Sequence, residues 1–208
     1  MQRAIAYLLL LLGLFTISAQ AALVSGPMIS HIDMREAKIW IQVDAPSLVR
    51  IAYSVADDSD SLHWTPPVET NNSQANTAVL TLDKVEPGLS YSYRVELNGE
   101  IVTSPAKFTS PANYHGRTPP PDFKVAVGGA HYVIEEGFEP PYQILGDGYS
   151  IFSAIAETKP NLMIWAGNTA HLRKSDWTTQ SGYLKRYAMA RSIPCLLYTS
   201  DAADEFSC

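Results

Sequence analysis

Three consecutive prolines at positions 119–121 separate two stretches of sequence with different hydrophobic patterns. Before them, short segments alternate apolar and polar residues, which is typical of half-buried β-strands. After them, apolar residues follow one another without alternation, which is typical of parallel strands covered on both faces. The sequence therefore predicts a multidomain chain, with an all-β domain and an α/β domain joined by a stiff, Pro-rich linker over residues 110–122.

The all-β half, residues 22–109, is predicted to form a β-sandwich. The segment AKIWIQVDA places Ile39, Ile41 and Val43 on one face, with polar residues and Trp40 on the other. The pair Asn98-Gly99 supplies the positive φ angles of a tight hairpin turn. Several short strands with regular turn signals are typical of a sandwich. The expected strands span residues 37–45, 47–55, 75–82, 89–97 and 101–108.

A tyrosine near the start of one expected strand has a specific predicted role. The stretch LDKVEPGLSYSYRVEL (82–97) resembles the fibronectin type III pattern, in which Pro-Gly precedes a strand that carries a tyrosine. The resemblance implies that the hydroxyl of Tyr91 bonds back to the preceding loop. A ligand-binding role for Tyr91 or Tyr93 is the alternative.

The second half predicts strand, helix, strand and helix in that order. The expected strands span 123–129 and 161–167, and the expected helices span 148–160 and 181–192. This order favours a parallel sheet, in which ligands bind beyond the carboxyl ends of the strands. The residues that follow the two strands, in VGGAHY and AGNTAHLR, are therefore the candidates for function.

Several classes of function find no support in the motifs or the charge. Gly128-Gly129 lacks the GxGxxG spacing of a dinucleotide site, and no GK[ST] of a phosphate-binding loop follows. The chain also lacks the GxSxG of a serine hydrolase. The formal net charge of −6 becomes −4 without Arg3 of the first 21 residues and without Asp201, Asp204 and Glu205 of the last 14, and this mild acidic balance argues against a nucleic-acid partner, which would favour a basic patch.

The first 21 residues are interpreted as a secretory signal. Arg3 precedes an apolar run, and Ala19-x-Ala21 forms a small-residue cleavage site before Ala22. We therefore expect a secreted or periplasmic protein without a stable membrane anchor after cleavage. An uncleaved anchor is the alternative interpretation.

The last residues, 195–208, are interpreted as a non-native tail. The run CLLYTSDAADE resembles the translation of a sequencing adapter, so we expect the native sequence to stop at or near Pro194. An ordinary disordered tail is the alternative. Both cysteines of the chain, Cys195 and Cys208, lie in this tail, so no native disulfide is predicted.

Several segments together resemble a known family. The resemblance covers residues 24–194 and is carried by GPMISHI, AKIWIQ, FKVAVGGAHY, LMIWAGNTAHLRKSDW and RYAMARSIP. These segments are similar to the PhoD-like alkaline phosphatases of the calcineurin-like metallophosphoesterase superfamily. The resemblance implies a fibronectin III- or immunoglobulin-like sandwich, followed over residues 123–194 by the first part of an αββα metallophosphatase domain. It also implies hydrolysis of small-molecule phosphate esters with divalent or trivalent ions such as iron or calcium.

The resemblance also assigns roles to individual residues. Asn168 stands where the family has an aspartate that bridges two metal ions, and His131 matches the histidine of the superfamily's Asp-x-His. The expected metal ligands are therefore His131 and Asn168. His171 and Arg173 are the expected catalytic residues, in contact with the phosphate. His171 departs from the tyrosine that is common there, and Gly129 replaces the aspartate of Asp-x-His.

These departures weaken the predicted metal site. Two dications about 3.5–4 Å apart repel by roughly 20 kcal/mol at an effective dielectric of about 20. A bridging carboxylate offsets that repulsion, whereas the neutral amide of Asn168 does not. We therefore expect no phosphatase activity and doubtful metal binding from this chain. A pseudophosphatase, or a binding or adhesion module carried by the sandwich, is the alternative function.

Structural roles for the same residues remain open. Asn168 can brace its loop, His131 can be a hydrogen-bonded loop histidine, and Arg173 can be a solvated charge. Asp176 is expected at the start of a helix. Trp165 and Trp177 are expected to pack in the interior.

Overall fold

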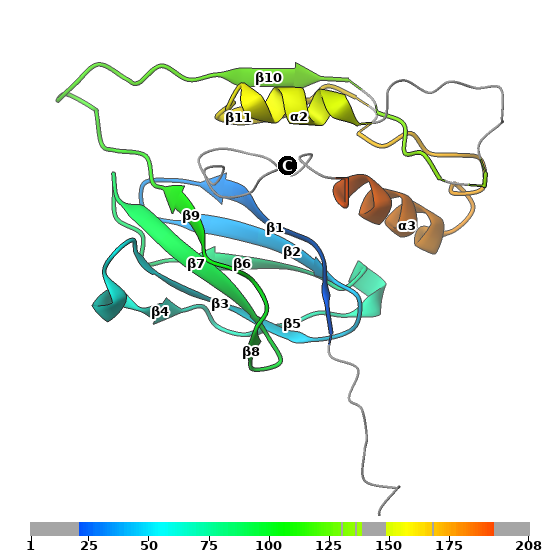
Figure 1. The fold of residues 1–208 in the computed structure, drawn as a ribbon, viewed down its shortest axis with the longest axis horizontal. Helices are drawn as coiled ribbons and strands as arrows, with labels where there is room; N and C mark the ends of the chain where they lie inside the picture. Colours follow the sequence, from blue (N-terminus) through cyan, green and yellow to red (C-terminus); the bar gives the residue numbers. More distant parts are fainter. Residues whose placement is uncertain (1–20, 130, 136, 139–148, 168, 194–208) are drawn as a thin grey trace, which may run out of the picture.

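The computed structural model describes residues 21–129, 131–135, 137–138, 149–167 and 169–193. It contains a β-sandwich followed by a small parallel sheet with two helices, as Figure 1 shows. Residues 1–20 of the predicted signal, Asn168 and the predicted tail from Cys195 on lie outside the described residues. No helix in the described ranges is long and apolar enough to cross a membrane.

The sandwich consists of two antiparallel sheets. One sheet has the order β1-β2-β6, and the other has the order β4-β3-β7-β8, with β5 also pairing with β3 and β9 with β7. The elements are β1 (Leu23–Ile32), β2 (Ala37–Val43), β3 (Leu48–Val55), η1 (Ser59–Ser61), β4 (His63–Trp64), β5 (Val68–Glu69), η2 (Asn72–Gln74), β6 (Thr77–Leu82), β7 (Ser90–Leu97), β8 (Glu100–Ile101) and β9 (Ala106–Thr109). The strands β1, β4 and β5 were not among those predicted.

Alternation along β2 places one face of the strand in the sandwich core. Ile39, Ile41 and Val43 are buried as predicted, and they pack with residues of β3, β6 and β7 in one hydrophobic cluster. Gln42, on the face expected to be polar and open, is also buried. Its Nε2 donates to the carbonyl oxygen of Ala75 at 3.0 Å, which satisfies part of the amide.

The predicted hairpin turn is confirmed at Asn98-Gly99. Both residues have positive φ angles, 50° and 94°, and they connect β7 to β8. The single strand predicted over 101–108 is instead divided into β8 and β9. Pro105 lies in the gap between them and has no N–H to donate to a ladder, which is consistent with this break.

The corner tyrosine is also confirmed. The backbone N–H of Glu86 donates to the hydroxyl oxygen of Tyr91 at 2.7 Å. The Tyr91 ring is buried and stacks on Phe108 with centroids 5.2 Å apart. Tyr91 therefore ties the loop before β7 to the core of the sandwich.

The linker over 110–122 is less extended than predicted. The N–H groups of Arg117 and Thr118 both donate to the carbonyl oxygen of Tyr114, which closes a turn before the prolines. His115 in this turn is exposed.

The second part contains β10 (Val125–Gly128), α2 (Ser150–Glu157), β11 (Leu162–Trp165) and α3 (Gln180–Arg191). The two strands pair in parallel, as the unalternating pattern predicts. Phe152 of α2 and Ala190 of α3 are buried in a second hydrophobic cluster, against which Trp165 of β11 packs. This arrangement confirms the predicted order and pairing of the elements.

One face of the parallel pair is open, although covered faces were predicted. The register places Val125 beside Leu162 and Val127 beside Ile164, and all four side chains are at least 40% exposed. Within the described residues, this face therefore has no covering layer. The second part rests on the sandwich through α3, where the Ser25 hydroxyl donates to the carbonyl oxygen of Arg191 at 2.8 Å.

Candidate functional site

The loops that follow β10 and β11 lie side by side. The N–H of Ala166 donates to the carbonyl oxygen of Gly128 at 2.7 Å, and the N–H of His171 donates to the carbonyl oxygen of His131 at 3.0 Å. Parallel strands end at the same edge of a sheet, so their following loops meet there. The structure therefore brings the two predicted loops together at the predicted edge.

The imidazole of His131 lies among aromatic rings. Its centroid is 5.4 Å from that of Phe152, edge to face, and 5.4 Å from that of Trp165. Within the described part of the chain, neither Nδ1 nor Nε2 has a hydrogen-bond partner. Burial lowers the pKa of His131, because the charged imidazolium is poorly solvated there. His131 is therefore neutral at pH 7, and no described residue hydrogen-bonds to its ring nitrogens.

A neutral imidazole is the form that binds metals, but a metal centre needs further donors. The described residues contain no group of three His, Cys, Asp or Glu side chains that could hold an ion. Asn168, the other predicted ligand, lies outside the described residues. The rings of Phe152 and Trp165 that contact His131 supply none of the charged oxygens that hard ions prefer. The described residues therefore do not fit the two-ion centre that the resemblance implies.

The two predicted catalytic residues meet at Tyr132 rather than at His131. The exposed ring of His171 lies against the Tyr132 ring with centroids 5.5 Å apart. Arg173 donates from Nε to the Tyr132 hydroxyl at 3.2 Å, and its guanidinium lies over the ring at 5.6 Å. His171 and Arg173 thus both lie against Tyr132. The ring of His131 instead contacts Phe152 and Trp165.

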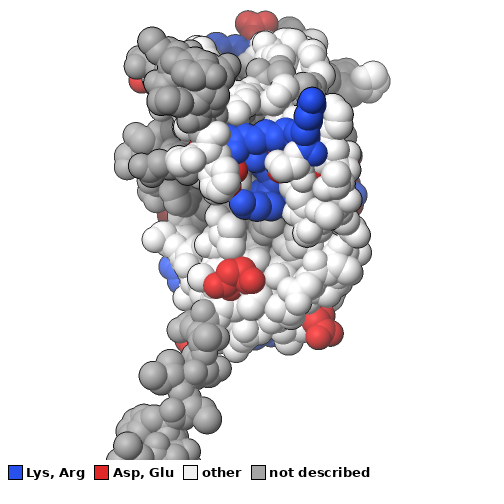
Figure 2. Space-filling model, turned by 90° about the vertical axis from the view of Figure 1, so that its right-hand side faces the viewer, with Lys and Arg blue, Asp and Glu red and all other residues white. Residues whose placement is uncertain are grey.

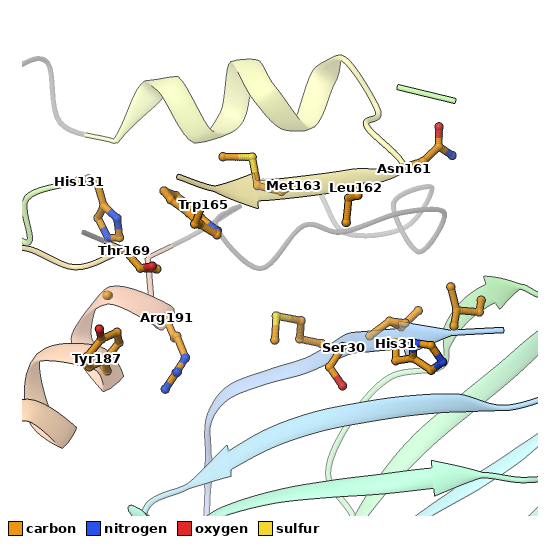
Figure 3. Close-up of a pocket in the computed structure, with 14 residues that line it drawn as sticks. Ser30, His31, His131, Asn161, Leu162, Met163, Trp165, Thr169, Tyr187 and Arg191 are labelled. Carbon is orange, nitrogen blue, oxygen red and sulfur yellow. The ribbon is translucent and has the colours of Figure 1, made fainter. Parts of the chain in front are cut away.

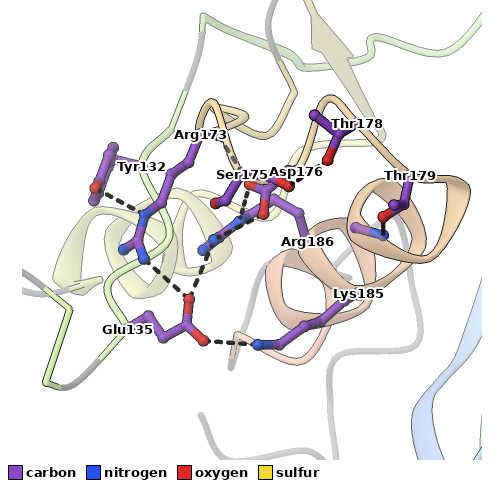
Figure 4. A network of polar contacts seen from close by, with 10 residues as sticks. Tyr132, Glu135, Arg173, Ser175, Asp176, Thr178, Thr179, Lys185 and Arg186 are labelled. Carbon is purple, nitrogen blue, oxygen red and sulfur yellow. Dashed lines mark hydrogen bonds and ion pairs between the residues drawn. The ribbon is translucent and has the colours of Figure 1, made fainter.

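Glu135, in the loop after β10, is the centre of an ion network that Figure 4 shows. Its carboxylate accepts from Arg173 Nη1 at 3.0 Å, from Lys185 Nζ at 2.8 Å and from Arg186 Nη2 at 3.2 Å. Lys185, Arg186 and Arg173 hold the pKa of Glu135 below its usual value, with the Lys185 hydrogen bond contributing most. Figure 2 shows basic side chains gathered on one face of the molecule.

Asp176 extends this network into the interior. Its Oδ2 accepts from Arg186 Nε at 2.9 Å and from the backbone N–H of Arg173 at 2.8 Å. The Arg186 hydrogen bond is the main reason why the pKa of Asp176 is lowered. Burial opposes the charge of Arg186, but Asp176 and Glu135 outweigh that cost, and its pKa is raised. The network therefore locks the loop after β11 onto α3.

Sequence reasoning did not find this network. Asp176 was expected to begin a helix, but α3 begins at Gln180, and the Thr179 side chain caps it by accepting from the Gly182 N–H at 3.0 Å. Glu135 and Arg186 carried no predicted role, because no spacing rule links residues so far apart in sequence. Trp165 packs as expected, whereas Trp177 is 60% exposed and does not.

Comparison with solved structures supports the architecture. A structure titled "Structure of PhoD" matches with a TM-score of 0.56 and 14% identity, over 86% of this chain and 35% of that chain. The present chain thus spans about a third of the PhoD structure. At this identity the likeness shows the fold alone, and the chain resembles part of a PhoD-like protein.

The other comparisons concern the sandwich. Residues 20–115 match a family described as a domain of unknown function, DUF7800. The sensor domain of the anti-sigma factor RsgI4 from Pseudobacteroides cellulosolvens matches 46% of the chain at 15% identity, with a TM-score of 0.37 and 99% of that chain covered. The fn3 domain of human collagen alpha-1(XX) matches 49% at 17% identity, with a TM-score of 0.32 and 95% covered. The search of curated proteins found no match.

Proposed function

We propose that this chain carries the first part of an exported, metal-dependent phosphoric ester hydrolase of the PhoD type, and that it is inactive by itself. The observation that most strongly supports a PhoD-type hydrolase is that the loops after β10 and β11 are hydrogen-bonded to each other. They lie in a fold that matches PhoD over 86% of the chain. The expected substrates of the whole hydrolase are small phosphate esters. The expected location is the periplasm or the cell exterior.

The proposed inactivity follows from the donors that are present. Two-ion phosphatases need charged ligands that hold both ions close together. His131 is a single neutral donor among aromatic rings, and Asn168 replaces the aspartate that the resemblance implies. Arg173, the expected phosphate contact, pairs with Glu135 at 3.0 Å, so an incoming phosphate would have to compete with that carboxylate.

The test is an assay of the purified chain with p-nitrophenyl phosphate and bis(p-nitrophenyl) phosphate. Calcium, manganese and iron ions would be added in turn, with metal-only reactions as blanks. We expect no hydrolysis above the blanks. A saturable, metal-dependent rate that the His131→Ala variant abolishes would contradict the proposed inactivity and would show that the described donors suffice.

A pseudophosphatase is the second candidate, and the aromatic surroundings of His131 favour it. Sequencing the locus beyond Pro194 separates it from the hydrolase. Further histidine and aspartate ligands there would support an active parent with this chain as its first part. A continuation without them would support a protein that keeps the fold for binding alone, through the sandwich or through another surface.

A further inference from the structure

A cavity of about 470 Å³ lies between the sandwich and the second part of the chain. Figure 3 shows β11 above it and β1 below it, with the end of α3 at its left. Much of its wall is apolar and includes Met28, Ile29, Leu162 and Met163. Its volume is in the range of about 300–1,000 Å³ that is usual for small-molecule sites.

Arg191 provides a positive charge to this cavity. It lines the cavity from the last turn of α3, and its guanidinium lies 4.9 Å from the ring of Trp40 and 5.4 Å from that of Tyr187. Within the described residues, no carboxylate pairs with it. The two ring faces and the carbonyl end of α3 stabilise the charge only in part. Burial lowers the pKa of Arg191, yet a guanidinium remains protonated at neutral pH.

The other polar groups of the cavity add little charge. His131 lines it with two ring nitrogens that have no hydrogen-bond partner among the described residues, and burial keeps the imidazole neutral. His31 lies at the cavity with half of its side chain exposed, 3.7 Å from Glu36. Glu36 in turn pairs with Lys38 at 3.2 Å, so its charge is balanced. Among the described residues, the cavity therefore combines a guanidinium that pairs with no carboxylate and an extended apolar wall.

We propose that this cavity binds a small monoanion with an apolar body, namely an aliphatic carboxylate of about eight carbon atoms. The carboxylate pairs with the planar guanidinium of Arg191, whose geometry suits two parallel hydrogen bonds. The apolar body lies against Met28, Leu162 and Met163. A doubly charged phosphate ester would fit less well, because one cation balances only one of its charges. The inference uses no metal ion and does not depend on the phosphatase proposal.

The first test is a titration of the full chain with octanoate, followed by tryptophan fluorescence and calorimetry. Trp165 lines the cavity and Trp40 stacks on Arg191, so occupancy should change the emission. A ligand of this size is expected to bind with a Kd of about 0.1–1 mM. Octanol, with the same body and no charge, and octyl phosphate should both bind at least about fivefold more weakly. Equal binding of octanoate and octanol would overturn the role of Arg191.

The second test uses variants. Arg191→Met keeps the length of the side chain and removes its charge, and it should weaken octanoate binding by about tenfold while leaving octanol unchanged. Arg117→Met, in the exposed linker, is the matched control and should leave both unchanged. Ser30→Trp should obstruct the cavity from the exposed end of β1 and abolish binding without touching Arg191, so it tests the site even if Arg191→Met unfolds. Unaltered octanoate binding in Arg191→Met or in Ser30→Trp would overturn the proposal.

Discussion

Arg186 of α3 donates from Nε to Oδ2 of Asp176 over 2.9 Å, and its side chain is only 3% exposed. This buried pair connects the loop after β11 to the helix that rests on the sandwich. Gly182 permits the contact, because a Cβ there would lie 2.7 Å from the carbonyl oxygen of Asp176. The position of the candidate loops therefore depends on an ion pair as well as on the small hydrophobic cluster.

Removing one member of this pair should loosen the second part. Arg186→Met leaves the carboxylate of Asp176 buried without its main partner. We therefore expect the unfolding free energy of the second part to fall by on the order of 3 kcal/mol. Urea unfolding followed by tryptophan fluorescence would measure the change. Lys185→Met, at the exposed end of the same network, is the control and should cause little change. Equal effects of the two substitutions would show that burial of the pair is unimportant.

The same network predicts how stability depends on pH. The pKa values of Glu135 and Asp176 are both lowered in the folded state. A carboxylate whose pKa is lower in the folded chain than in the unfolded chain stabilises the fold at pH values above its unfolded pKa. This stabilisation is lost as the pH falls through the folded pKa. The second part should therefore lose stability below about pH 4, where carboxylates begin to protonate. The midpoint temperature of thermal unfolding, measured at several pH values between about pH 3 and pH 7, would test this. In the double variant Glu135→Gln, Asp176→Asn the acid-dependent loss should be smaller.

Local patterns predicted the elements of this chain better than its side-chain contacts. Alternation identified the core face of β2, and Asn98-Gly99 identified the hairpin, because both signals act over a few neighbouring residues. The parallel pairing of β10 with β11 followed from their continuous apolar runs. The division of the last predicted strand into β8 and β9 was missed, although Pro105 marked the break.

The candidate site was predicted less completely for a physical reason. The edge of the sheet where the loops meet follows from topology, so the neighbourhood of His131 and His171 could be predicted. The partners of their side chains could not, because Glu135 and Arg186 come together only when distant segments pack. The open face of the parallel pair also differs from the covered sheet that its composition indicates.

The corner tyrosine gives a prediction for the sandwich. Tyr91→Phe removes the acceptor of the Glu86 N–H and should lower the unfolding free energy of the sandwich by about 1 kcal/mol. Denaturant unfolding followed by circular dichroism would measure it. Tyr114→Phe, at an exposed position in the linker, is the matched control. An unchanged midpoint for Tyr91→Phe would show that water satisfies this N–H equally well.

The start of β1 gives a prediction about export. The backbone nitrogen of Ala22 lies 2.8 Å from Oδ1 of Asp44, and the N–H of Asp44 donates to the carbonyl oxygen of Ala22. Cleavage before Ala22, as we expect, would turn that nitrogen into an ammonium group facing the carboxylate. Mass spectrometry of the exported protein should find Ala22 as its first residue. In the cleaved protein that begins at Ala22, Asp44→Asn should lower stability slightly. The loss should be smaller when the nitrogen of Ala22 is acetylated, because an acetylated nitrogen carries no positive charge to pair with Asp44.

The open face of the parallel pair predicts that the two parts of the chain differ in stability. Val127 and Ile164 are 67% and 45% exposed, whereas the sandwich core is fully enclosed. Exposed apolar strands with free edges favour association between copies. We expect the second part to unfold first and light scattering to rise with protein concentration. The variant Val127→Lys, Ile164→Glu should reduce that scattering and leave the sandwich transition unchanged, while Val24→Lys, a control on the sandwich surface, should not reduce it. A single unfolding transition reported by every probe would contradict this prediction, because it would mean that both parts are held together as one cooperative unit.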